Sequence, residues 1–211
     1  VTNTLVGPAV DGQQVQVFTE GYQPYMFYVY HQLYDKSGKP IEGAYADLNG
    51  DGVINTSDLY RYNSPAPDYM MGFSLNLRYK RVSLGTSLRA NIGGYVYNGM
   101  AMNTGAWGTV SYNNYQLNNL NRSFLETGFK SRQHLSDYYV ENASFLKMDN
   151  ISLAYDFGRI NDMFNLNASF MVQNVFTITE YTGVDPEIPN GVDVSFYPRP
   201  RVFSFSLGLE F

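Results

Sequence analysis

The side chains best suited to chemistry in this chain belong to one loop, residues 47–58. Ca²⁺ prefers hard oxygen ligands, and an EF-hand-like loop supplies them from alternate positions and from its last residue, with a glycine at the sharp turn. The spacing therefore predicts a structural calcium site. The simpler alternative is a turn that needs no ion, because Asn, Asp and Gly favour turns on their own. The predicted ligands are Asp47, Asn49, Asp51, the carbonyl of Val53, Asn55 and Asp58, with Gly52 at the turn.

No other group of side chains has a spacing that supports catalysis. His31 and His134 are the only histidines, and the chain has no cysteine for a thiolate nucleophile or a disulfide framework. We expect both histidines at a surface or rim. A set of carboxylates in the second half invites an acid–base role, but solvated loop and pore positions explain it more simply. These are Asp137, Glu141, Asp149 and Asp156. The sequence thus predicts that the chain is not an enzyme.

Aromatic side chains are the remaining candidates for ligand contact. Trp107, Tyr112 and Tyr115 could stack on sugar rings or pack their loop onto a partner, because amphipathic aromatic rings suit either role. A second aromatic group, between residues 22 and 34, could form a girdle at a membrane–water boundary.

Composition excludes several classes of protein. Only 16% of the 211 residues are charged, and the net charge is −5, so no basic stripe is present to neutralise nucleic-acid phosphates. There is no uninterrupted apolar run of about 18 residues, the length that a transmembrane helix needs. A transmembrane β-barrel is still compatible, because half of each barrel strand is polar. We expect the chain, which begins at Val1, to be a piece of a longer protein.

Alternating hydrophobicity predicts the strands that position these residues. Between Phe203 and Phe211 every odd residue is apolar and the even ones are small or polar, so the two faces of the strand differ. A break in phase at 145–150 suggests a β-bulge. The expected strands cover 69–80, 82–92, 144–157, 165–176 and 202–211, with a less regular sixth candidate at 25–34.

The connections between these strands alternate in length. Those at 35–68, 93–143 and 177–201 are long, whereas 80–81 and 158–164 are short. Antiparallel strands then place every long loop at one end, as in outer-membrane barrels with short periplasmic turns and long extracellular loops. We therefore expect an all-β fold, an antiparallel segment of a larger transmembrane barrel. Residues 1–24 would be an extended segment or loop, and 25–211 the strands and extracellular loops. Six strands cannot close a single-chain barrel.

Several motifs, in order, resemble the SusC/RagA-type TonB-dependent outer-membrane transporters of Bacteroidetes. The resemblance covers roughly residues 21–211. It is carried by Gly38-Lys39-Pro40 with the loop 47–58, Pro67-Asp68-Tyr69-Met70-Met71-Gly72-Phe73, Tyr138 to Leu153, Gln173-Asn174-Val175-Phe176, Tyr181 to Glu187, and Tyr197-Pro198-Arg199-Pro200-Arg201.

The resemblance implies the C-terminal strands of a barrel of about 22 strands, closed by a plug. It also implies import of oligosaccharides or peptides, a SusD-like surface lipoprotein as partner, energy from TonB through the missing N-terminal part, and contact with outer-membrane lipid.

Two alternatives stay open on the sequence alone. The chain could be a non-transporting surface β-domain that binds carbohydrate. It could also be a secreted accessory domain with a dockerin-like calcium loop, because Asp58 replaces the usual glutamate at the last position and no flanking helices are predicted. Only one copy of the loop is present, whereas a dockerin normally has two.

Overall fold

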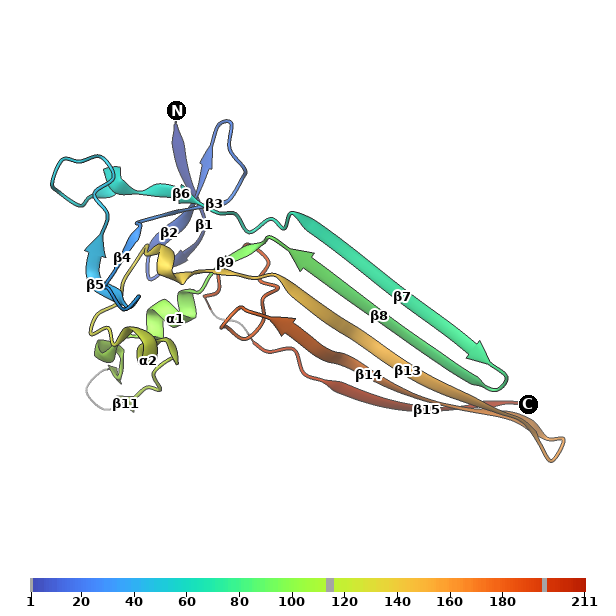
Figure 1. Cartoon of the computed structure of the whole chain (residues 1–211). Coiled ribbons are helices and arrows are strands. Elements are labelled where there is room, and N and C mark those ends of the chain that lie inside the picture. Colours follow the sequence, from blue (N-terminus) through green and yellow to red (C-terminus); the bar gives the residue numbers. More distant parts are fainter. Residues whose placement is uncertain (1, 113–115, 195–196) are drawn as a thin grey trace. The chain divides into compact units, whose positions relative to one another are not determined.

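The computed structural model describes residues 2–112, 116–194 and 197–211 (Figure 1). The chain divides into two compact units, each assembled from three segments. The first, here the loop unit, contains residues 1–67, 94–143 and 181–197. The second, the sheet unit, contains residues 68–93, 144–180 and 198–211. Residues on both sides of the expected division between 24 and 25 belong to the loop unit, and that division stays a prediction.

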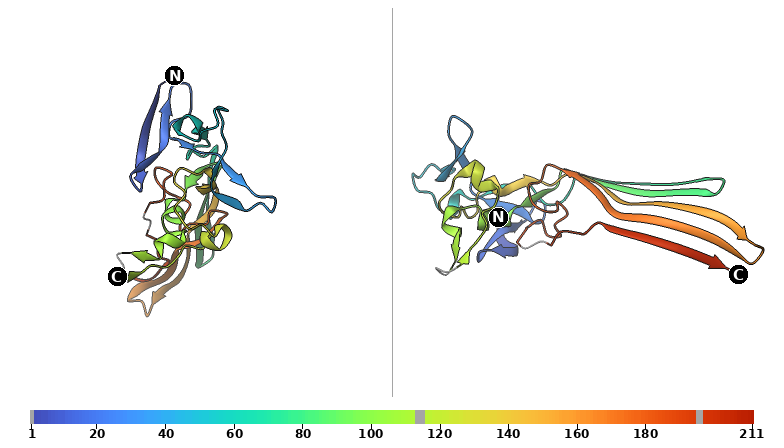
Figure 2. Two further views of the ribbon diagram at one scale, coloured as in Figure 1. Left: turned by 90° about the vertical axis from the view of Figure 1, so that its left-hand side faces the viewer. Right: turned by 90° about the horizontal axis from the view of Figure 1, so that it is seen from below.

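Five long antiparallel strands make up the sheet unit. They lie in the order β15-β14-β13-β8-β7, and Figure 2 shows that the two edge strands stay apart, so the sheet is open. The all-β, antiparallel class predicted from the sequence is confirmed. The strands are β7 (Tyr69–Tyr79), β8 (Val82–Ile92), β13 (Phe145–Ile160), β14 (Phe164–Thr179) and β15 (Val202–Glu210).

The two faces of this sheet carry different residues in every strand. One row across the sheet pairs apolar side chains: Leu77, Leu84, Leu153, Phe170 and Phe205. The adjacent row, on the opposite face, pairs Arg78, Ser83, Ala154, Ser169 and Ser206. The apolar side chains are not covered by a second protein layer. Phe205 is 68% exposed and Leu207 is 63% exposed.

A bulge near the start of β13 keeps this two-faced pattern in register. The pairing of β13 with both neighbours shifts between Met148 and Asn150, which confirms the bulge predicted from the break in phase. Before the bulge, Lys147 pairs with Arg89 in the polar rows, and Met148 pairs with Leu88 in the apolar ones. One extra residue therefore moves the odd-numbered side chains from one face to the other.

The short and long connections leave opposite ends of the sheet. The short turns lie where Tyr79 pairs with Val82 and Ile160 pairs with Phe164. At the other end, Tyr69 pairs with Ile92, and the long connections begin. The predicted asymmetry is confirmed for these five strands.

The sixth predicted strand, at 25–34, is wrong as a strand of this sheet. Its residues form β3 (Met26–Val29) and β4 (Gln32–Tyr34), which pair within the loop unit. Phe27 and Val29 are fully buried there. Alternation shows that one face of a strand is covered, but it does not show whether lipid or protein covers that face.

The loop unit folds around its own core instead of forming three separate loops. A four-stranded sheet joins β1 (Asn3–Val10), β2 (Gln13–Thr19), β3 and β6 (Tyr60–Tyr62). The strand pairs are β4 with β5 (Pro40–Tyr45), β9 (Tyr95–Tyr97) with β12 (Val140–Asn142), and β10 (Ser111–Tyr112) with β11 (Gln116–Leu117). The α-helices are α1 (Gly99–Thr104) and α2 (Ser123–Thr127), and single 3-10 turns cover Thr56–Asp58, Trp107–Thr109 and Asp137–Tyr139.

The core of the loop unit takes residues from all three of its segments. Because each segment supplies only part of the apolar surface, none of them buries this core alone. The buried cluster is Val10, Val15, Phe27, Val29, Tyr97, Ala101, Met102, Tyr139, Val140 and Val192. Among the described residues, no helix is long and apolar enough to span a membrane.

The assignment of the two sheet faces predicts the effect of single charges. Leu207→Arg in the full-length protein should cost about 2–4 kcal/mol of barrel stability if the position lies near the bilayer midplane, because hydrocarbon cannot solvate the guanidinium. Ser206→Arg is the matched control on the opposite face and should be milder. The amount of folded, heat-modifiable protein in membranes measures both. Equal losses for the two variants would contradict the face assignment.

Candidate functional site

The loop 47–58 is held by side-chain oxygens that accept hydrogen bonds from its own backbone. Asp47 accepts one from Gly50 N at 2.7 Å and one from Gly52 N at 2.7 Å. Asp51 Oδ1 accepts a bond from Val53 N at 2.8 Å. Successive acceptors thus turn the chain tightly, and positive φ angles of 75° at Gly50 and 80° at Gly52 allow that turn.

Asp58 closes the loop. Its Oδ1 accepts bonds from Leu48 N at 3.0 Å and Asn49 N at 3.3 Å, and its Oδ2 accepts one from Asn55 N at 2.9 Å. The bond from Asn55 N–H, followed by those from the other two amides, holds the pKa of Asp58 below its usual value. Asn55 in turn caps the 3-10 turn by accepting a bond from Ser57 N. The last predicted ligand is therefore also the residue that fixes the fold of the loop.

Within the described part of the chain, no group of three or more His, Cys, Asp or Glu side chains is arranged to hold a metal ion. The ligand set predicted for the loop is different in kind, because it mixes carboxylates with amide and backbone carbonyl oxygens. A carboxylate oxygen that accepts one N–H bond also keeps a second lone pair. Calcium binding at this loop stays a prediction.

Of the three aromatic candidates, only the side chain of Trp107 is described. Trp107 is 60% exposed, and the centroid of its ring lies 6.1 Å from that of Phe124. Tyr112 belongs to β10, but its side chain is not described, and Tyr115 lies outside the described residues. A contact between these rings and a ligand also stays a prediction.

A polar cluster that sequence spacing did not reveal surrounds Asp137. Its Oδ2 lies 2.8 Å from His31 Nδ1 and accepts a bond from the hydroxyl of Tyr60 at 2.6 Å. Its Oδ1 accepts a bond from Gln32 N at 2.9 Å. The expectation that Asp137 is a solvated loop carboxylate is therefore wrong, because its side chain is only 8% exposed. His31 is half exposed, as expected of a surface histidine.

Burial, reinforced by the hydrogen bond to Asp137, raises the pKa of Tyr60. The partners of Asp137 lie 77 to 106 residues away along the chain, so no local pattern could have indicated the cluster. Asp137 thus holds β4, β6 and its own 3-10 turn together by one buried carboxylate. Among the described contacts, no serine, threonine or cysteine side chain lies against His31 there.

The other carboxylates are also paired. Glu141 accepts bonds from Asn98 Nδ2 and Thr182 N, both at 2.8 Å. On the polar face of the sheet unit, Arg89 donates to both oxygens of Asp149, at 2.6 Å and 2.9 Å.

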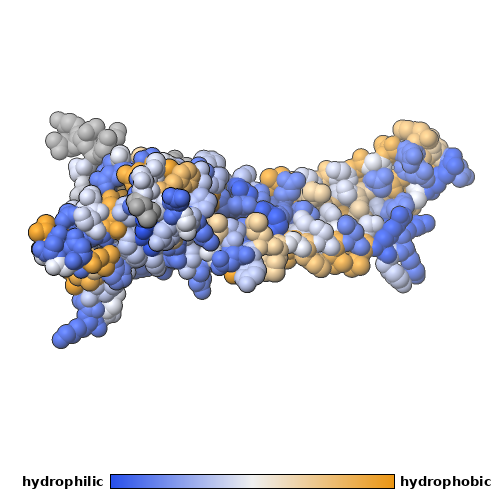
Figure 3. Space-filling view, turned by 90° about the horizontal axis from the view of Figure 1, so that it is seen from above, coloured by the Kyte–Doolittle hydropathy of each residue, from blue (hydrophilic) through white to orange (hydrophobic). Residues whose placement is uncertain are grey.

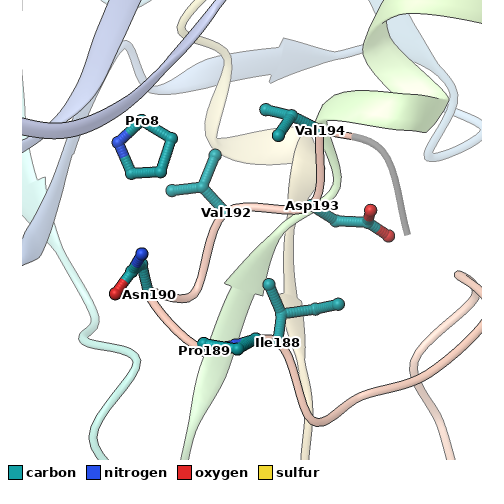
Figure 4. A pocket seen from close by; sticks show the side chains of 7 residues that line it. All are labelled: Pro8, Ile188, Pro189, Asn190, Val192, Asp193 and Val194. Carbon is teal, nitrogen blue, oxygen red and sulfur yellow. The ribbon is translucent and has the colours of Figure 1, made fainter. Parts of the chain in front are cut away.

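A cavity of about 200 Å³ lies in the loop unit (Figure 4). Figure 4 shows the carboxylate of Asp193 turned away from Pro8 and Asn190 on the opposite wall. That carboxylate accepts a bond from the hydroxyl of Tyr181 at 2.7 Å, and burial raises its pKa. The cavity is lined by Pro8, Ile188, Pro189, Asn190, Val192, Asp193 and Val194, and is mostly apolar.

Known proteins are similar to this chain in sequence and in fold. No family model matches the chain. It is 37% identical to the TonB-dependent receptor SusC of Bacteroides thetaiotaomicron, over 94% of this chain and 20% of SusC. It is 28% identical to the TonB-dependent receptor P3 of Formosa agariphila, over 79% of this chain and 19% of that receptor.

The chain belongs to the SusC/RagA-type TonB-dependent receptors. It spans about a fifth of the length of the curated relatives that it matches. These receptors are outer-membrane proteins and not enzymes, so the receptor segment described here lies in the outer membrane.

Solved structures of the RagAB peptide importer share the fold of this segment. In its 'closed-closed' state the TM-score is 0.70 at 24% identity, over 93% of this chain and 24% of that one. In its 'open-open' state the TM-score is 0.72 at 23% identity, over 93% of this chain and 23% of that one.

The Asp137 cluster predicts how the loop unit responds to the loss of one carboxylate. Asp137→Ala in the full-length receptor leaves the buried amide of Gln32 and the hydroxyl of Tyr60 without an acceptor. Each such group costs about 1–3 kcal/mol. Hydrogen exchange at Gln32 and its neighbours should accelerate accordingly, while exchange in β7 and β8 stays unchanged. Glu20→Ala, which removes an exposed carboxylate, is the control and should leave both regions unchanged. Unchanged exchange at Gln32 would refute a structural role for Asp137.

Proposed function

We propose that the chain forms part of a transporter that imports oligosaccharides or peptides across the outer membrane, driven by TonB and assisted by a SusD-like surface lipoprotein. The observation that carries this proposal is the 37% sequence identity to SusC, together with the difference between the two faces of the sheet. A sheet with one apolar face exposed along its length and one polar face suits the wall of a pore in lipid.

The open edges support a wall that continues beyond these strands. In hydrocarbon, each unpaired backbone N–H or C=O group costs several kcal/mol, so β7 and β15 need further strands beside them. A soluble surface or accessory domain would instead bury the apolar face under protein. The exposure of Phe205 and Leu207 therefore argues against both alternatives that the sequence left open.

The loop unit is suited to contact with a lipoprotein partner. Every long connection of the sheet contributes to it, and it folds around a core of its own. A folded unit presents a defined surface, which lowers the entropy cost of ordering loops when a partner binds. The loop unit also contains the half-exposed His31 and the exposed Trp107, which are available to cargo or partner.

Deleting the gene for the full-length receptor tests the proposal. Uptake of labelled oligosaccharides or peptides should fall to background and return with the wild-type gene. A tagged receptor should also co-purify a surface lipoprotein. Unchanged uptake of both cargo classes in the deletion strain would overturn the proposed transport function. A receptor that purifies without a lipoprotein would overturn the proposed partner.

The proposal includes a calcium ion with a structural role at the loop 47–58. The order of its oxygen ligands supports it, and the ion would stiffen a loop that backbone hydrogen bonds already fold. Asp51 is the most informative position, because it is exposed and its bonds remain within the loop.

Two substitutions distinguish a loss of calcium binding from a loss of the loop's folded structure. Asp51→Ala should abolish one calcium site in a titration of the full-length receptor. Without calcium it should accelerate proteolysis of the loop only slightly, because a single backbone amide, that of Val53, loses its acceptor. Asp58→Ala should accelerate that proteolysis, because three backbone amides lose their acceptor. Equal calcium stoichiometry in wild type and Asp51→Ala would eliminate the proposed site.

A further inference from the structure

Two neighbouring cations form the short turn between β7 and β8. Lys80 and Arg81 are the two residues between these strands, and both are exposed. They lie at the end of the sheet opposite the long connections. Figure 3 shows hydrophilic residues gathered at that end, beyond the apolar stretch of the sheet. Since barrels of this kind have short periplasmic turns, this end faces the periplasm.

Turn geometry alone does not explain the lysine. Lys80 adopts a φ of 52°, in the left-handed region that favours glycine or asparagine. Its Nζ lies 5.4 Å from the centroid of the Tyr79 ring, and no other contact to this ammonium is recorded among the described residues. The turn therefore holds a cation where its backbone would favour a neutral residue.

Arg81 is held in place and still has donors to offer. One guanidinium nitrogen, Nη1, donates to the carbonyl of Phe157 at 3.2 Å. The carbonyl of Arg81 accepts a bond from Asp156 N at 2.8 Å, which ties the turn to β13. A guanidinium has five N–H donors. Within the described residues only this one hydrogen bond from Arg81 is recorded, so most donors remain for an external acceptor.

Aromatic rings join this turn to the apolar face. Tyr79 is 73% exposed, and the rings of Tyr155 and Phe157 meet edge-to-face at 4.7 Å. Tyr79, Val82 and Tyr155 lie in one row across the apolar face. Tyrosine and tryptophan rings of membrane proteins lie at the level of the lipid headgroups. Lys80 and Arg81, next to Tyr79, therefore lie close to the headgroups.

The nearby carboxylate belongs to the other face. Asp156 pairs with Asn167 in the polar rows, and its carboxylate lies 4.0 Å from Arg78. Arg159 also pairs in the polar rows, with Asn165. Lys80 and Arg81 are thus the two exposed cations of the turn itself, and the turn follows directly on Tyr79 of the apolar rows.

We propose that Lys80 and Arg81 bind the phosphate of an anionic phospholipid in the periplasmic leaflet, whose acyl chains lie along the apolar face beside Tyr79 and Tyr155. A guanidinium recognises phosphate through paired N–H donors, and the ammonium adds a point charge. A phospholipid fits better than a protein partner, because the cations adjoin a surface that already contacts lipid. This inference rests on the outer-membrane location and not on the identity of the cargo.

Native mass spectrometry of the full-length receptor, released from nanodiscs of phosphatidylglycerol and phosphatidylcholine, tests the site. Wild type should retain phosphatidylglycerol preferentially. Lys80→Asn and Arg81→Gln should each weaken that retention roughly fivefold, the equivalent of about 1 kcal/mol for each charge at an anionic surface. Asn suits the left-handed position, so Lys80→Asn preserves the turn.

Arg159→Gln is the matched control, because it removes one charge at the same end of the sheet from the polar face. It should leave the lipid preference unchanged. Undiminished phosphatidylglycerol in the Lys80→Asn/Arg81→Gln double variant would overturn the proposal. So would an equal loss in Arg159→Gln, which would indicate a dependence on overall charge. A periplasmic protein retained by wild type in place of lipid, and lost in the double variant, would assign the turn to that protein.

Discussion

Backbone hydrogen bonding in a medium without water is the constraint on which the sheet unit depends. Every N–H and C=O group that enters hydrocarbon needs a partner, and only a helix or a closed sheet supplies all of them. The five long strands pair continuously apart from two local shifts in register in β13. The same constraint leaves β7 and β15 incomplete by themselves, so their outer edges are positions where further strands must pair.

The bulge in β13 shows how the sequence reconciles pairing with two different environments. A strict alternation over all sixteen residues of β13 would put Lys147 on the same face as Leu153. The shift after Met148 instead places Lys147 beside Arg89 and keeps Leu146 and Met148 with the apolar rows. Regular pairing is interrupted at this bulge. As a result, Lys147 lies on the polar face of the sheet and not on the face that meets lipid.

The sequence predicted the sheet unit far better than the loop unit, and the reason is the range of the interactions. Residues such as Phe203 and Phe205 reveal their environment through neighbours two positions away, so alternation located all five strands and the bulge. Residues 25–34 show a similar pattern, yet Phe27 and Val29 are covered by protein contributed from distant segments. The Asp137 cluster depends on partners far along the chain, which no local window contains. The loop 47–58 lies between these cases, because its spacing predicted a compact turn, whereas the closing role of Asp58 became visible only in its bonds.

The two ends of the sheet meet different demands, and their residues differ accordingly. The long connections fold into a unit with its own core. At the short-turn end the chain must only reverse, and two residues suffice between β7 and β8. A turn chosen for reversal alone would place Gly or Asn at the left-handed position. Lys80 at that position, next to an arginine with one side-chain hydrogen bond among the described residues, supports the proposed contact of this turn with lipid phosphate. Aromatic rings on the same face place that interaction at the boundary between hydrocarbon and water, where phosphate is the most abundant anion a membrane offers.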